Sequence, residues 1–100
     1  MGAKLSTPRF LVELPDADPF EVQAIGADLV RWDMTAAKHK WPSYDTAPFL
    51  WSTFLAWSAG RRTGQVSADV TFERFADVVV QVEALNVDAV GPTDAGPAPA

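Results

Sequence analysis

The stretch from Phe49 to Trp57 limits the possible folds more than any other part of this 100-residue chain. A proline at position 48 is tolerated in the first turn of a helix, and the residues after it are apolar almost all the way round. A helix of this kind is either the central buried element of a small domain or a surface for a partner. Its large apolar residues are Phe49, Leu50, Trp51, Phe54, Leu55 and Trp57.

Flanking residues predict where this helix and the preceding one begin and end. Ser43 or Asp45 can cap the apolar helix, and Gly64 can terminate it. An earlier helix is predicted to run from an N-cap at Asp28 to near Trp41, where the next residue is a proline. Its apolar stripe consists of Leu29, Trp32 and Ala36.

Two short segments near the N-terminus have the patterns of β-strands. Residues 10–14 form an apolar run that ends at a proline, and residues 20–25 alternate apolar and polar side chains. The loop between them is short and rich in Asp and Pro, so a β-hairpin is predicted. Because a lone hairpin is only marginally stable, we expect helices to cover it. An all-helical structure of residues 9–25 is the alternative.

The most regular helical stripe of the chain follows Thr71, which can cap a third helix. The valines at 78–80 are β-branched and would allow a strand, but the surrounding period favours a helix. The apolar residues of the stripe are Phe72, Phe75, Ala76, Val79 and Val82.

Together these segments predict an α+β fold, with an N-terminal β-hairpin followed by about three packed helices; an all-α fold is the alternative. Residues 1–8 are predicted as a flexible N-terminus, 9–87 as a single globular domain and 88–100 as a disordered tail rich in Pro and Ala. We expect no signal peptide, because no long apolar run follows the N-terminal lysine, and the longest apolar stretch, 47–59, is shorter than the ~20 residues of a membrane span. We therefore expect a cytoplasmic protein with no membrane partner.

Composition argues against several kinds of chemistry. The chain has no cysteine and one histidine, which excludes thiolate sites, cysteine nucleophiles and multi-histidine metal sites. His39 lies between two lysines without an orienting acid, and turn formation explains Asp16 and Asp18 better than a cation site does. The net charge of −5 argues against a nucleic-acid partner. We expect no catalytic residues, no cofactor and no metal.

Charge and tryptophan are both concentrated in the middle of the chain. Residues 31–62 are mildly basic between two acidic ends, which predicts helices of opposite charge packed side by side or, alternatively, a polar contact face. All four tryptophans lie in this stretch, and the stripes place Trp32 and Trp51 in the core. The other two stand near helix ends, where tryptophan suits a protein interface. The predicted partner-binding residues are Trp41, Phe49, Trp57, Arg61 and Arg62.

The same aromatic residues carry a resemblance to a known family. The residues concerned are Val30-Arg31-Trp32-Asp33, Lys40-Trp41-Pro42, Ala47-Pro48-Phe49-Leu50-Trp51, Phe54-Leu55-Ala56-Trp57, Gly64 and Thr71-Phe72-Glu73-Arg74-Phe75. With the preceding hairpin, this order resembles short tail assembly chaperones of long-tailed, siphovirus-type phages that infect actinobacteria. The resemblance covers roughly residues 9–85, and it consists of aromatic identity and spacing rather than catalytic residues.

The resemblance implies a non-enzymatic chaperone that binds the tape measure protein during tail assembly in the host cytoplasm and is absent from the mature virion. Further partners that it implies are the tail tube protein and a frameshifted longer form of the chain itself, and a homo-oligomer is a further expectation. Two other functions remain open. One is a structural virion component, such as a connector or tail-associated protein, and the other is a small regulatory domain that binds a host protein.

Overall fold

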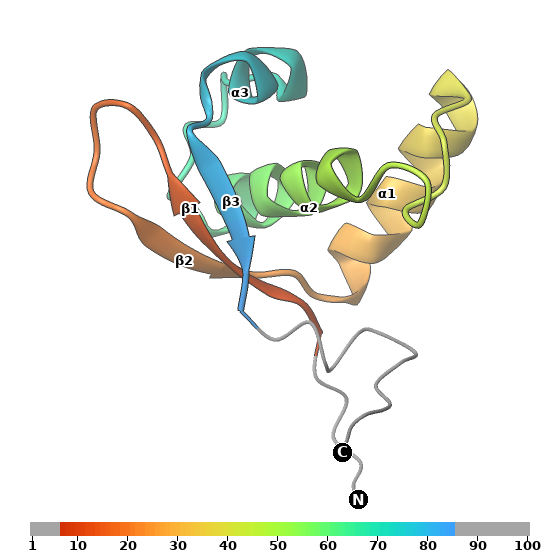
Figure 1. Ribbon diagram of the computed structural model, residues 1–100, viewed down its shortest axis with the longest axis horizontal. Coiled ribbons are helices and arrows are strands. Elements are labelled where there is room, and N and C mark those ends of the chain that lie inside the picture. The colour runs from red at the N-terminus through yellow and green to blue at the C-terminus, as the bar shows by residue number, and fades with distance from the viewer. Residues whose placement is uncertain (1–6, 86–100) are drawn as a thin grey trace, which may run out of the picture.

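The computed structural model describes residues 7–85, which form three strands and three helices (Figure 1). The predicted α+β class is confirmed, and the all-helical alternative for residues 9–25 is wrong. The predicted tail at 88–100 and residues 1–6 of the predicted flexible N-terminus lie outside the described residues. In chain order the elements are β1 (Arg9–Glu13), β2 (Phe20–Gln23), α1 (Gly26–His39), α2 (Pro48–Thr63), α3 (Phe72–Val78) and β3 (Gln81–Ala84).

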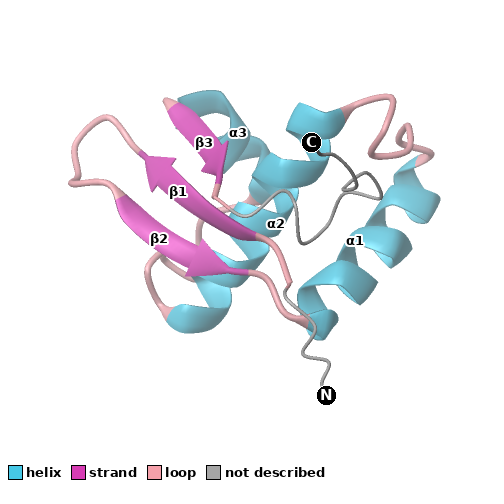
Figure 2. Ribbon diagram, turned by 60° about the horizontal axis from the view of Figure 1, so that its bottom comes forward, coloured by secondary structure: helices cyan, strands magenta, loops and turns pink. Residues whose placement is uncertain are grey.

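The strands form an antiparallel sheet in which β1 lies between β2 and β3 (Figure 2). Strands β1 and β2 make the predicted hairpin, with Phe10 opposite Val22 and Val12 opposite Phe20. The alternation of side chains places Phe10, Val12 and Val22 in the core. The carbonyl of Pro8, a residue predicted to be flexible, accepts a hydrogen bond of 2.9 Å from the N–H of Ala24.

Helix α2 is the central element, because it contacts both other helices and all three strands. Proline 48 is its first residue, as predicted, but the N-cap residue is Ala47 rather than Ser43 or Asp45. The Ser43 hydroxyl instead donates a hydrogen bond to the Asp45 carboxylate in the preceding turn, so neither side chain reaches the helix. Gly64 ends α2 in the left-handed conformation, at φ 88°, which confirms the predicted terminator.

Helix α1 begins three residues earlier than an N-cap at Asp28 would require. Its N-cap residue is Ile25, and the Asp28 carboxylate accepts a hydrogen bond of 2.9 Å from the Ile25 N–H. An acid in the first turn also suits the positive end of the helix dipole. The helix ends at His39, and Lys40 follows in the left-handed conformation at φ 59°, just before the predicted end near Trp41.

The third helix departs most from the prediction. Its N-cap is correct, since Thr71 Oγ1 accepts a hydrogen bond of 3.1 Å from the Arg74 N–H. The predicted continuation of the helix to Val82 is wrong, because α3 ends at Val78 and the chain then becomes strand β3. Strand β3 pairs antiparallel with β1, with Val82 opposite Val12.

Two physical causes favour the strand. Val79 and Val80, which follow α3, are β-branched and prefer extended backbone, and the outer edge of β1 offers hydrogen-bonding groups that a third strand can satisfy. Of the predicted helical stripe, Phe72 and Phe75 are buried, whereas Val79 and Val82 are half-buried and reach the core from the extended segment. The apolar residues Val79 and Val82 therefore continue the helical spacing of Phe72 and Phe75 only by coincidence, because their segment pairs with the sheet.

The core lies between the sheet and the helices. Trp32 is buried, as predicted, while Trp51 is half-buried and meets the ring of Phe10 edge-on at a centroid distance of 6.3 Å. The largest fully buried apolar side chains are Phe10, Phe54, Phe75, Leu55 and Val12. They come from β1, α2 and α3, so the core joins segments from both halves of the described chain.

Candidate functional site

Two of the predicted partner-binding residues, Trp41 and Trp57, belong to an aromatic cluster between the helices. Neighbouring rings have centroids 5.3 to 6.0 Å apart and meet in tilted or edge-on arrangements, which aromatic pairs prefer. Both tryptophans contact Phe54 and Phe72, so the fold brings them to the same part of the core. The aromatic cluster consists of Trp32, Trp41, Phe54, Trp57 and Phe72.

Both tryptophans of the predicted surface are half-buried, so part of each ring reaches the exterior. The Trp57 indole N–H donates a hydrogen bond of 2.8 Å to the carbonyl of Val70, which satisfies its one donor and fixes the ring. Trp41 stacks with the His39 ring at a centroid distance of 5.1 Å. Packing alone therefore explains why these two tryptophans are present.

Phe49 has a different environment at the start of α2. Its side chain is 82% exposed, the largest fraction among the large apolar residues that the structure describes. It borders a groove of about 280 Å³, in which Val80 is also 57% exposed. We call this the Phe49 groove; it is lined by Phe49, Ser52, Thr53, Val79, Val80, Gln81 and Val82. The groove is apolar surface that packing within the described chain leaves exposed.

Arg62 is directed into the protein rather than toward a partner. Its Nη2 donates to the Asp28 carboxylate at 2.9 Å and to the Gln23 carbonyl at 2.8 Å, and its Nε donates to the same carboxylate at 3.2 Å. Asp28 is only 1% exposed, and it also accepts a hydrogen bond of 2.6 Å from the Ser58 hydroxyl. We call Asp28, Ser58 and Arg62 the buried polar network. It joins the start of α1 to the end of α2.

The buried polar network controls the pKa of Asp28. Burial by itself raises this pKa, because a desolvated carboxylate is costly to ionise. Hydrogen bonds from Ser58, from the Ile25 N–H and from Arg62, together with the charge of Arg62, outweigh burial and lower the pKa below its ordinary value of 3.8. Asp28 is therefore ionised at neutral pH and compensates the charge of Arg62.

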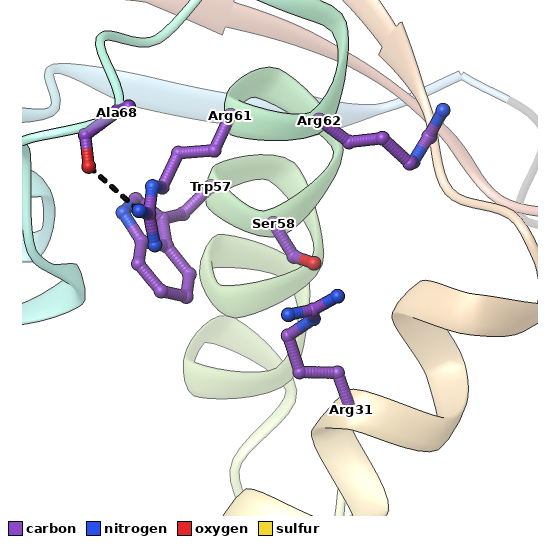
Figure 3. A pocket seen from close by; sticks show the side chains of 6 residues that line it. All are labelled: Arg31, Trp57, Ser58, Arg61, Arg62 and Ala68. Atoms are coloured by element: carbon purple, nitrogen blue, oxygen red, sulfur yellow. Dashed lines mark hydrogen bonds between the residues drawn. The ribbon is translucent and has the colours of Figure 1, made fainter.

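Arg61 stands on a different side of α2, above the ring of Trp57 (Figure 3). Its guanidinium carbon lies 4.9 Å from the ring centroid, and its Nη2 donates a hydrogen bond of 2.6 Å to the carbonyl of Ala68. These residues border a pocket of about 220 Å³. We call it the arginine pocket; it is lined by Arg31, Trp57, Ser58, Arg61, Arg62 and Ala68.

The five predicted partner-binding residues thus lie in three places. Trp57, Arg61 and Arg62 line the arginine pocket, Trp41 is in the aromatic cluster but does not line that pocket, and Phe49 borders its own groove. Phe49 precedes Trp57 by eight residues, or about 12 Å along a helix. The predicted single surface is therefore divided by the fold.

Sequence reasoning missed two residues of these surfaces, Val80 and Arg31. Val80 was assigned to the third helix, and only the turn into β3 brings it beside Phe49. Arg31 faces the arginine pocket because α1 packs against α2. The basic character of residues 31–62 was the one indication in the sequence that cations would gather there.

Residues 7–85 contain neither a metal-binding cluster of side chains nor a helix that could span a membrane. Within that range, no three His, Cys, Asp or Glu side chains gather in a way that could hold a metal ion. Asp16 and Asp18 are exposed in the loop between β1 and β2. None of the helices in the described part of the chain combines the length and apolar character that crossing a membrane requires.

Comparisons of the chain with protein families, with curated proteins and with solved structures find no match. The Phe49 groove exposes the apolar side chains of Phe49 and Val80, and the arginine pocket gathers three guanidinium groups. Exposed apolar side chains suit protein contacts, and guanidinium groups suit carboxylates and phosphates.

Proposed function

We propose that this protein is a non-enzymatic phage tail assembly chaperone that binds the tape measure protein in the host cytoplasm. The observation that carries the proposal is Phe49, which is 82% exposed beside an apolar groove. Exposed apolar patches of this kind mark sites of protein interaction, and covering a phenylalanine contributes about 2 kcal/mol to binding. A chaperone needs apolar surface of this kind to hold an unassembled partner.

The composition of the groove supports a helical partner segment. Val79 and Val82 line it together with Phe49, while Ser52 and Thr53 contribute polar groups. Helices dock in such grooves through apolar side chains spaced three and four residues apart. The net charge of −5 would keep unoccupied copies apart by mutual repulsion. The aromatic spacing of residues 30–83, which resembles the chaperone family, directs the proposal toward the tape measure protein.

Co-expression with the tape measure protein of the same phage, followed by affinity capture and size-exclusion chromatography, tests the proposal. We expect the two proteins to co-purify and Phe49→Ser to reduce the captured amount strongly. Met34→Ser is the matched control, because Met34 is 69% exposed on α1 but does not border the groove. This control should capture the tape measure protein as the unaltered chain does.

Two results would contradict the proposal. One is a monodisperse chain that does not associate with the tape measure protein. The other is a constant copy number of the chain in purified virions, which would indicate a structural virion component instead. Far-UV circular dichroism of both variants would verify that a loss of capture does not come from unfolding.

A further inference from the structure

We propose that the arginine pocket binds the carboxylate of a glutamate side chain on the partner protein. This inference rests on the proposed function, since it specifies the chemistry of the same partner at a second contact. The pocket lies near the C-terminal end of α2, whereas Phe49 lies near its N-terminal end. The two contacts can therefore be tested separately.

Charge is the first argument. The pocket is lined by three arginines and by no acidic residue, although the chain carries a net charge of −5. The Asp28 carboxylate compensates Arg62, and Figure 3 shows the Arg62 side chain pointing away from the other two arginines. Within residues 7–85, neither Arg31 nor Arg61 forms an ion pair. Two positive charges at one pocket thus lack a counter-charge from the described residues.

Preorganisation is the second argument. The Ala68 carbonyl and the Trp57 ring hold the Arg61 guanidinium in place, at 2.6 Å and 4.9 Å respectively. A guanidinium has five N–H donors, so most of those of Arg61 remain available to a ligand. Arg31 extends from α1 toward Ser58 on the other side of the pocket (Figure 3). A side chain that is already fixed loses less entropy when it binds, and this favours affinity.

The chemistry of the walls favours glutamate. Guanidinium groups bind carboxylates through two parallel, charge-assisted hydrogen bonds. The half-buried Trp57 ring offers an apolar wall for the methylene groups of a longer acidic side chain. The nearest acidic residue of the chain does not fill the arginine pocket. Asp69, which follows Ala68, does not line the pocket, and its carboxylate accepts a hydrogen bond of 2.5 Å from Ser67.

The experiment is a titration of the full chain with three probes, monitored by the NMR signal of the Trp57 indole N–H. The probes are a capped peptide of alternating Glu and Ala, the same peptide with Gln in place of Glu, and inorganic phosphate. Trp57→Phe identifies the signal. We expect the Glu peptide to shift it in a saturable way, the Gln peptide to leave it unchanged, and phosphate to bind at least about tenfold more weakly than the Glu peptide.

Variants of single arginines localise the binding. Arg31→Gln and Arg61→Gln should each weaken binding of the Glu peptide about tenfold, the effect of losing one charge-assisted contact. Arg74→Gln changes the net charge equally but alters an exposed residue on α3, outside the pocket. This control should stay within about twofold of the unaltered chain. Arg31→Gln should fold normally, because the Arg31 side chain forms no hydrogen bond or ion pair within residues 7–85.

Several outcomes would overturn the inference. They are the absence of a shift with the Glu peptide, equal binding of the Glu and Gln peptides, equal losses in all three arginine variants, and phosphate binding as tight as that of the Glu peptide. The last would indicate a general oxyanion site. If the Glu peptide binds but the tape measure protein is not captured, the proposed function fails, while the preference of the arginine pocket for a glutamate carboxylate stands. If the double variant Arg31→Gln/Arg61→Gln captures the tape measure protein normally, the proposed function stands and only the role of the arginine pocket in partner binding fails.

Discussion

The two ends of helix α2 differ in what their side chains contact. Near the C-terminal end, Ser58 and Arg62 bind the buried carboxylate of Asp28, and Gly60 packs closely against Val66. At the N-terminal end, Phe49 is 82% exposed beside its groove. Ser58 and Arg62 are thus part of the internal structure, whereas Phe49 presents apolar surface to the exterior.

The sequence predicts that Arg62 and Phe49 both face a partner. Phe49 is exposed, as that prediction requires, whereas Arg62 is paired internally with Asp28. The two residues are thirteen positions apart, or about 20 Å along the helix. A side chain's chemistry does not decide whether it is structural, since that depends on which neighbours the fold supplies.

The largest effect is expected for Asp28→Ala. The substitution would leave Arg62, the Ser58 hydroxyl and the Ile25 N–H without their shared acceptor, and breaking a buried ion pair in this way costs about 4 kcal/mol in the free energy of unfolding. Urea denaturation monitored by tryptophan fluorescence measures it. Asp33→Ala, which alters an exposed acid on the same helix, should change stability by less than about 0.5 kcal/mol. Equal losses in both variants would contradict a special role for the buried polar network.

The second effect is expected for Gly60→Ala. A Cβ atom at position 60 would lie 2.5 Å from Cγ2 of Val66, a β-branched side chain with little freedom to move aside. We expect the free energy of unfolding to fall by about 2 kcal/mol, although alanine normally favours a helix. Gly26→Ala is the control, because a Cβ there meets no atom within 4 Å. If Gly60→Ala instead stabilised the protein, the end of α2 and the segment around Val66 would have to be packed less closely than a Cβ-to-Cγ2 distance of 2.5 Å implies.

A smaller effect is expected from pH. The pKa of Asp28 is lower in the folded protein than its ordinary value of 3.8, so the ionised carboxylate stabilises the fold above about pH 4. This stabilisation is lost as the pH falls through the folded-state pKa. Between about pH 5 and about pH 2, the free energy of unfolding should fall more steeply for the unaltered chain than for Asp28→Asn. Parallel pH profiles would mean that other carboxylates dominate.

The smallest effect on stability is expected for Phe49→Ser. Because Phe49 is 82% exposed, its replacement should change the free energy of unfolding by less than about 0.5 kcal/mol. The same urea titration measures this. A loss above about 1 kcal/mol would show that Phe49 belongs to the core, and the contrast between the two ends of α2 would then disappear.

Local chemistry predicted the hairpin, the Pro48 start and Gly64 end of α2, and the Thr71 cap, because each depends on residues close together in sequence. The same reasoning misplaced the N-cap of α1 at Asp28. Aspartate is favourable at the N-cap itself, but it is also favourable three residues after the N-cap, where it accepts a hydrogen bond from the N–H of the N-cap residue, as Asp28 does from Ile25. The residue type alone therefore fits both positions. Asp28 also binds Ser58 and Arg62 of α2, and these contacts are not visible in the sequence around Asp28.

The candidate surfaces were predicted only in part. The prediction named Phe49, Trp57 and Arg61, but it could not separate the exposed phenylalanine from the packed tryptophan, since both lie on one helix that is apolar nearly all round. It also missed Val80 and Arg31, whose positions depend on how β3 and α1 are placed against α2.

By itself the sequence determined the α+β class, the hairpin, the Gly64 end of α2 and the Thr71 cap, because strand alternation, caps and a terminating glycine act on the nearby backbone. Tertiary structure alone decided that residues 81–84 pair with β1, that Arg62 meets Asp28 thirty-four residues away, and that Phe49 stays exposed. These outcomes depend on contacts between residues distant along the chain. Their energies are absent from any local pattern and arise only when the elements pack together.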